Sequence, residues 1–101
     1  MKSDKKVANK ILKDAIKLVE KGWCREAFAL DKHGRNVQSR SPKAVQWCIQ
    51  GALIAVKDTS NSYCLLVDRH YKMFGEFFMA FNDAPNRTQA EVIKRLKALM
   101  T

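Results

Sequence analysis

The dipeptide Trp-Cys occurs twice in this chain, as Trp23-Cys24 and as Trp47-Cys48. Cysteine sulfur is a preferred ligand of zinc and the nucleophile of many enzymes, so these positions are the first candidates for chemistry. Zinc sites are typically built from C-x₂₋₄-C pairs, and neither dipeptide nor the remaining cysteine, Cys64, supplies one. We therefore predict no metal and no cofactor, and we expect both Trp-Cys pairs to pack in the core.

Cys24 supplies the one catalytic alternative. Arg25 beside it would lower the pKa of the thiol, and His33 follows nine residues later as a candidate base. The carboxylates show no spacing that predicts a paired site, and the chain has neither a Gly-rich phosphate loop nor a G-x-S-x-G motif. We predict that the protein is not an enzyme, and a small enzyme using the Cys24 thiol is the third hypothesis.

Positive charge is the strongest functional signal in the sequence. The chain of 101 residues carries 19 Lys and Arg against 10 Asp and Glu, a formal charge of +9. The net charge is positive in residues 1–43 and again in residues 87–101, whereas residues 44–86 carry three basic and four acidic groups. Such asymmetry predicts an anionic partner, either nucleic acid or an acidic protein surface.

Lysines recur every three or four residues near the N-terminus. Over Asp4–Lys21 they occupy one half of a predicted amphipathic helix, opposite an apolar half that includes Ile11, Leu12 and Val19. Solvated helix faces usually mix the two signs of charge, and the centre of this one is nearly all lysine. The predicted anion- or nucleic-acid-binding residues are Lys6, Lys10, Lys13, Lys17 and Lys21.

A second candidate site is polar and lies in two loops. Arginine suits bidentate capture of anions, so the two loops, if they lie together, form a clamp for a nucleotide or signal molecule. Structural bridges between the loops are the alternative explanation of the same residues. The candidate ligand site consists of Arg35, Arg40, Asn82, Asp83 and Arg87.

Helical elements must position both candidate sites. Residues 23–30 predict a short helix or a turn of one, and residues 31–40 a loop. Ser41 and Pro42 are a favourable N-cap and first position for a helix that continues to about residue 57. A helix over 63–74, with a cap at Thr59 or Ser60, and a short aromatic helix over 76–81 follow.

The last helix begins at a capping box, in which Glu91 follows Thr88 by three residues. No segment shows the alternation of a strand. The fold prediction is all-α, a compact single domain over residues 1–101, built as a bundle of four main helices plus one or two short helices. A small-residue pair, Gly51-Ala52, is expected to allow another helix to approach closely.

The order of these motifs resembles a known group of sequences. Gly22-Trp23-Cys24, then Ser41-Pro42 with a second Trp-Cys, then a run from Asn82 to Val92 of the form N-D-x-P-x-R-T-x-x-E-V, is similar to an uncharacterised family, a domain of unknown function in small bacterial and bacteriophage proteins. The resemblance covers about residues 7–99. It implies a helical domain and a setting on phages or mobile elements, but it carries over no catalytic residue.

The leading functional prediction is a small, basic, non-enzymatic binding protein. As a phage or mobile-element accessory factor it would engage nucleic acid or a nucleic-acid-associated host protein, with inhibition of host defence as one role. The odd cysteine count and the lack of a signal peptide or a long apolar run predict a cytoplasmic protein without a membrane span. The alternative is a protein that binds or sequesters a nucleotide or signal molecule through the loop arginines, and a homo-oligomer is compatible with either role.

Overall fold

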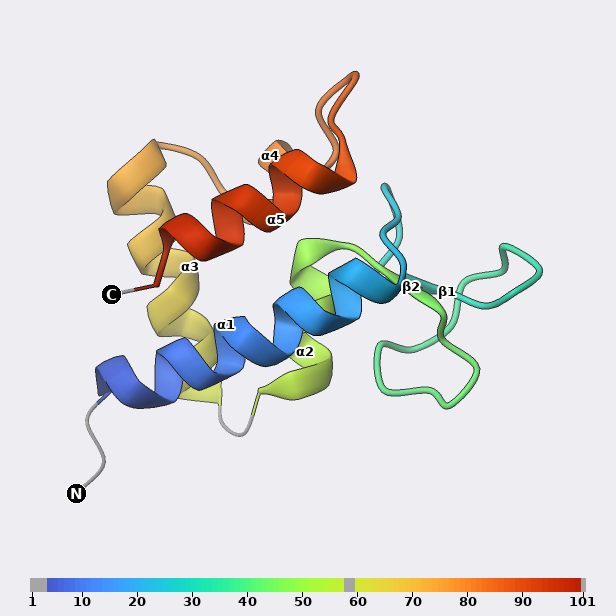
Figure 1. The fold of residues 1–101 in the computed structure, drawn as a ribbon, viewed down its shortest axis with the longest axis horizontal. Helices are drawn as coiled ribbons and strands as arrows, with labels where there is room; N and C mark the ends of the chain where they lie inside the picture. The colour runs from blue at the N-terminus through green and yellow to red at the C-terminus, as the bar shows by residue number, and fades with distance from the viewer. Residues whose placement is uncertain (1–3, 58–59, 101) are drawn as a thin grey trace.

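The computed structural model describes residues 4–57 and 60–100 (Figure 1). Within these ranges the elements, in chain order, are α1 (Asp4–Lys21), β1 (Ala29–Leu30), β2 (Gln46–Trp47), α2 (Ile49–Val56), α3 (Ser60–Phe74), α4 (Phe78–Asn82) and α5 (Gln89–Ala98). The prediction of a mostly helical fold is confirmed. The four-helix bundle is not, because α2 has only eight residues and the segment between α1 and α2 forms loops and two short strands.

Helix α1 is the element against which the others pack. It has the bounds that the sequence pattern predicts, and it contacts α2, α3, α5 and β2. Figure 1 shows α1 running beside α5, with α2 behind it. Burial of each large aliphatic side chain on its inner face contributes roughly 1.5–3 kcal/mol. The buried residues of this face are Ala8, Ile11, Leu12, Ala15, Ile16 and Val19.

The prediction of a helix beginning at Ser41 is wrong. The Ser41 hydroxyl accepts the N–H of Lys43, as a cap would, but only a single turn forms before the chain extends into β2. The backbone of Trp47 is used instead for sheet pairing, since its N–H donates to the Gly22 carbonyl and its carbonyl accepts from Cys24. Helix α2 therefore starts only at Ile49, where the pairing ends.

The prediction of a helical turn over residues 23–30 is also wrong. Ala29 and Leu30 form β1, which pairs antiparallel with β2 in the register Ala29 with Trp47 and Leu30 with Gln46. The apolar residues of this segment are spaced like those on one face of a helix, and this spacing favours helix locally. Long-range pairing with β2 overrides the local preference, as is common for short segments.

Helices α3, α4 and α5 follow the prediction more closely. The predicted cap residue Thr59 lies outside the described residues, and α3 begins at Ser60. The short aromatic helix α4 buries Phe78 and Phe81, as expected of a core plug, but Met79 and the N-cap residue Phe77 are more than half exposed. The capping box of Thr88 and Glu91 at the start of α5 is confirmed.

Gly51 lies in α2 where the backbone of residue 28 crosses the helix. A Cβ atom at this position would lie 1.8 Å from the Phe28 carbonyl oxygen, far inside van der Waals contact. The predicted close approach at Gly51 is therefore real, but the approaching element is the chain before β1 and not another helix.

We predict that Gly51→Ala destabilises the protein by more than about 2 kcal/mol. Helix propensity alone gives the opposite sign, because Ala is about 1 kcal/mol more favourable than Gly inside a helix. Urea unfolding followed by circular dichroism measures the difference. A neutral or stabilising effect would show that the Phe28 backbone does not pack against α2.

Candidate functional site

The five predicted lysines of α1 are all exposed. Lys10 forms an ion pair of 2.9 Å with Asp14, one helical turn away. Lys13, Lys17 and Lys21 form no ion pair with a carboxylate of the described residues. Exposed pairs such as Lys10–Asp14 contribute only about 0.3–0.5 kcal/mol, so this one does little to hold the ammonium group in place. The row therefore presents its positive charge to solvent.

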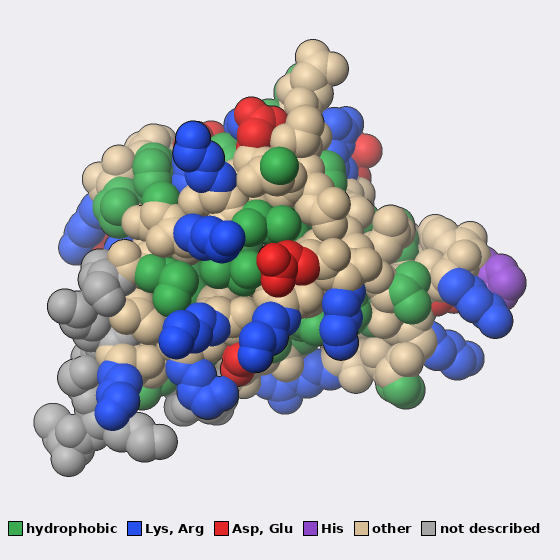
Figure 2. Space-filling view, viewed as in Figure 1, with side chains coloured by type: hydrophobic (Ala, Val, Ile, Leu, Met, Phe, Trp, Pro, Cys, Tyr) green, Lys and Arg blue, Asp and Glu red, His purple; other side chains and the backbone are tan. Residues whose placement is uncertain are grey.

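Helix α5 adds charge that the sequence prediction did not include. Lys94 and Lys97 are exposed on α5, which packs against α1. Figure 2 shows basic side chains over both helices on one face of the molecule, with few acidic ones between them. The basic C-terminal segment was visible in the sequence, but only the packing of α5 on α1 joins it to the lysine row. We call this surface, with α1 and α5, the basic face.

A groove of about 540 Å³ runs along α1 beside the end of α2. Lys6, Lys10 and Lys13 line it together with Asp14 and with apolar side chains, among them Val56 of α2. From Lys6 to Lys21 the row extends over roughly 22 Å at 1.5 Å per helical residue. That length matches an extended anion with many charges better than a single phosphate group.

The two Trp-Cys dipeptides lie next to each other. Trp23 and Trp47 form a parallel backbone bridge, which places Cys24 beside Cys48. Each tryptophan is an anchor as predicted: the Trp47 indole N–H donates to the Ser39 carbonyl, and that of Trp23 donates to Asn82 Oδ1. The repetition of the dipeptide thus corresponds to a pairing in space.

The surroundings of Cys24 do not activate its thiol. Burial raises the pKa of Cys24 to about 12, with further contributions from Cys48 and from the carboxylate of Asp83. Arg25, which was expected to lower that pKa, is exposed and turned to the Ala84 carbonyl. In the described part of the chain, no three His, Cys, Asp or Glu side chains are grouped so as to hold a metal ion.

We predict that Cys64, which is exposed, reacts with iodoacetamide at pH 8 at least ~100-fold faster than Cys24. With a pKa near 12, only about one Cys24 thiol in 10⁴ is ionised at that pH. Mass spectrometry of digests taken over time gives the three rates separately. If Cys24 reacts as fast as Cys64 or faster, the hypothesis of a catalytic thiol regains its basis.

Asn82, predicted as a ligand residue, is a structural centre. It is 1% exposed, and its Oδ1 accepts hydrogen bonds from Trp23 Nε1 at 2.8 Å and from the Ile49 backbone N–H at 3.0 Å. Its Nδ2 donates to the Cys24 carbonyl and to Asp83 Oδ1. One carboxamide thereby joins the end of α4 to the first Trp-Cys dipeptide and to Ile49, the first residue of α2, which directly follows the second dipeptide.

We predict that Asn82→Ala lowers the free energy of unfolding by about 3 kcal/mol, because it leaves buried donors and a buried carbonyl without partners. Asn36→Ala is the matched control, since Asn36 is exposed and its change is expected to stay within about 0.5 kcal/mol. Both are measured by urea unfolding. Equal losses in the two variants would contradict the role of Asn82.

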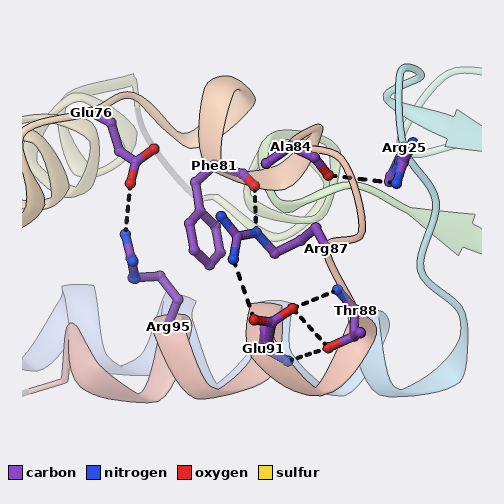
Figure 3. Close-up of polar contacts among 8 residues, drawn as sticks. All are labelled: Arg25, Glu76, Phe81, Ala84, Arg87, Thr88, Glu91 and Arg95. Carbon is purple, nitrogen blue, oxygen red and sulfur yellow. Dashed lines mark hydrogen bonds and ion pairs between the residues drawn. The ribbon is translucent and has the colours of Figure 1, made fainter.

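Arg87 is held in place by protein groups. Its Nε donates to the Phe81 carbonyl at 2.8 Å, and its guanidinium lies 3.8 Å from the centre of the Phe81 ring (Figure 3). Nη1 also reaches Glu91, whose pKa is lowered, chiefly by the N–H of Thr88 in the capping box. Arg95 covers the same ring at 3.9 Å. Phe81 is thus stacked by two arginines.

The remaining loop arginines are also engaged, at separate places. Arg40 donates to the carbonyls of Ile54 and Lys57 at the C-terminal end of α2, where a cation is favourable. Arg35 pairs with Asp31, whose pKa is lowered mainly by the hydrogen bond from the Arg35 N–H.

The structure does not bring the five residues of the predicted clamp into one site. Asn82 and Asp83 line a different cavity from Arg40, and Arg35 lines a third. The loop of Asp83 contacts the segment before β1, because the Glu26 N–H donates to Asp83, and Asn36 of the other loop lines the same cavity. The position of these residues in predicted loops could not show that Arg40 and Arg87 already donate hydrogen bonds to backbone carbonyls.

The comparisons with known proteins give one result. The model of a family of unknown function, DUF6197, matches residues 4–100. Neither the curated proteins nor the solved structures include a match. None of the described helices is long and apolar enough to cross a membrane. The match says nothing about bacterial or phage origin, so the setting on mobile elements stays a prediction, as do the cytoplasmic location and the oligomeric state.

Proposed function

Since the chain belongs to the DUF6197 family of unknown function, we propose a function from its geometry: it binds nucleic acid through the phosphate backbone, using the lysines of α1, and performs no catalytic step. The observation that carries the proposal is the exposure of all five predicted lysines, of which Lys13, Lys17 and Lys21 have no carboxylate partner among the described residues.

The physical basis of such binding is the release of counterions. A duplex carries one negative charge per about 1.7 Å of its axis, and each lysine that neutralises a phosphate frees a condensed cation. A row of roughly 22 Å, extended sideways by Lys94 and Lys97, is long enough to contact several phosphates. Lysine contacts phosphates more than it reads bases, so the proposed binding is independent of sequence.

The composition of the face favours a duplex over a single strand. Proteins that bind single strands stack bases on exposed aromatic side chains, and α1 contains no aromatic residue. An acidic protein surface is the competing partner. If the lysines served to bind such a surface, this protein would not be expected to bind unrelated duplexes with equal affinity. Action on host defence or transcription would be a consequence of this binding in a phage setting.

We predict that unrelated duplexes of equal length bind with equal affinity, and that log K falls with log of salt concentration with a slope of about −4.5 if all five lysines contact phosphates. Fluorescence anisotropy between 50 and 200 mM salt measures it. Lys13→Glu with Lys17→Glu should weaken binding at least ~10-fold and reduce the slope by about 2.

The matched control carries the same change of charge elsewhere. Lys32→Glu with Lys43→Glu alters two exposed lysines of the loops between α1 and β2, and this variant should keep the slope. All four positions are exposed, so unfolding free energies are expected to stay within about 0.5 kcal/mol per change. Absence of binding at 50 mM salt, or equal loss in the two double variants, would remove the proposal.

A further inference from the structure

We propose that a second site, independent of the basic face, binds an organic cation with an apolar body. The site is a cavity of about 430 Å³ between α4, the start of α2 and the loop segment before β1. Its volume lies in the range of small-molecule sites. The residues that carry the inference are Glu26, Phe28, Cys48, Met79 and Asp83, all of which line the cavity.

The charge of the lining selects the ligand. The protein has 19 Lys and Arg residues, yet this cavity is lined by two carboxylates, Glu26 and Asp83, and by no basic side chain. The other three cavities described above are each lined by at least one Lys or Arg. A negatively charged cavity in a protein of net charge +9 attracts a cation and disfavours the phosphates proposed for the basic face.

Asp83 has an acceptor available for such a cation. Its Oδ1 accepts hydrogen bonds from the Glu26 N–H at 3.0 Å and from Asn82 Nδ2 at 2.9 Å. These two bonds fix the carboxylate, while its Oδ2 has no hydrogen bond from any group of the described chain. An ammonium or guanidinium group donates several hydrogen bonds and would complete the pairing at Oδ2.

The backbone at the edge of the cavity is held in an uncommon conformation. Glu26 has φ 61°, in the left-handed region that side-chain-bearing residues seldom adopt. The hydrogen bond from the Glu26 N–H to Asp83 stabilises this conformation and brings the second carboxylate to the cavity. Backbone strain of this kind concentrates at ligand sites.

The apolar walls specify the body of the ligand. Phe28 and Met79 are 46% and 53% exposed although both line the cavity, so they leave apolar area uncovered. An aromatic ring or short aliphatic chain would cover Phe28 and Met79, and the Phe28 ring also suits a cation–π contact. The ligand class is therefore an aryl or alkyl amine or guanidine, present either as a free molecule or as the side chain of a basic peptide.

Benzylamine is the first probe, compared with its neutral counterpart benzyl alcohol and with anionic benzoate. We expect saturable binding of benzylamine in NMR titrations of ¹⁵N-labelled protein, with shifts at the amides of Glu26, Phe28 and Asn36, and at least ~10-fold weaker binding of the other two. A blocked Gly-Arg-Gly tripeptide tests the second source of the cation, the side chain of a basic peptide. Tighter binding of benzylamine would favour a free small molecule, and tighter binding of the tripeptide would favour a peptide.

Variants distinguish the effect of the two cavity carboxylates on benzylamine binding from the effect of the protein's net charge. Glu26→Gln and Asp83→Asn should each weaken benzylamine binding about 10-fold, whereas Glu20→Gln, the same loss of charge on α1, should not change it. If Asp83→Asn fails to fold, Glu26→Gln retains the test. The double variant Lys13→Glu with Lys17→Glu should bind benzylamine as the unaltered protein does. A loss of benzylamine binding can therefore be told apart from a loss of nucleic-acid binding.

The outcomes that overturn the proposal are specific. Equal binding of benzylamine and benzyl alcohol would show an apolar cavity without selection of charge. Equal loss in Glu26→Gln and Glu20→Gln would show that binding depends on net charge and not on this cavity. Shifts confined to amides outside the cavity would place the cation elsewhere on the protein.

Discussion

The fold depends on the buried carboxamide of Asn82. Helix α2 is short, and two side chains accept the free N–H groups of its first turn. The sulfur of the N-cap residue Cys48 accepts the Gly51 N–H, and Asn82 Oδ1 accepts the Ile49 N–H. The same side chain holds Trp23 and the Cys24 carbonyl. A single polar group with all its hydrogen bonds made thereby orients the end of α4, the start of α2 and the bridge between the two Trp-Cys segments.

Arginine and lysine have different tasks in this protein. Arg40 caps the end of α2, whereas Arg87 and Arg95 stack on Phe81, where a planar, weakly hydrated guanidinium is favourable. Lysine, with a compact and strongly hydrated charge, stays at the surface of α1. The suitability of arginine for bidentate anion capture is the basis of the predicted ligand clamp, but the structure divides these arginines among several structural contacts.

Prediction from the sequence succeeded where structure is determined locally. The bounds of α1 follow from its alternation of apolar residues and lysines, and the start of α5 follows from the capping box of Thr88 and Glu91. It failed over residues 23–30 and 41–47, where the cap signal at Ser41 was genuine but backbone pairing with distant residues competed with local preference. The loop predicted over residues 31–40 is confirmed. The exposure of the lysine row was predictable, but the addition of α5 to the basic face was not.

The sequence by itself determined the mostly helical content, the basic charge and the side of α1 that carries it, because these depend on residues a few positions apart. Only the tertiary structure decided that Trp23 pairs with Trp47, that Cys48 and Asp83 lie where they help to raise the pKa of Cys24, and that Glu26 and Asp83 share a cavity. Each of these results from contacts between segments far apart in the chain, which no local preference encodes.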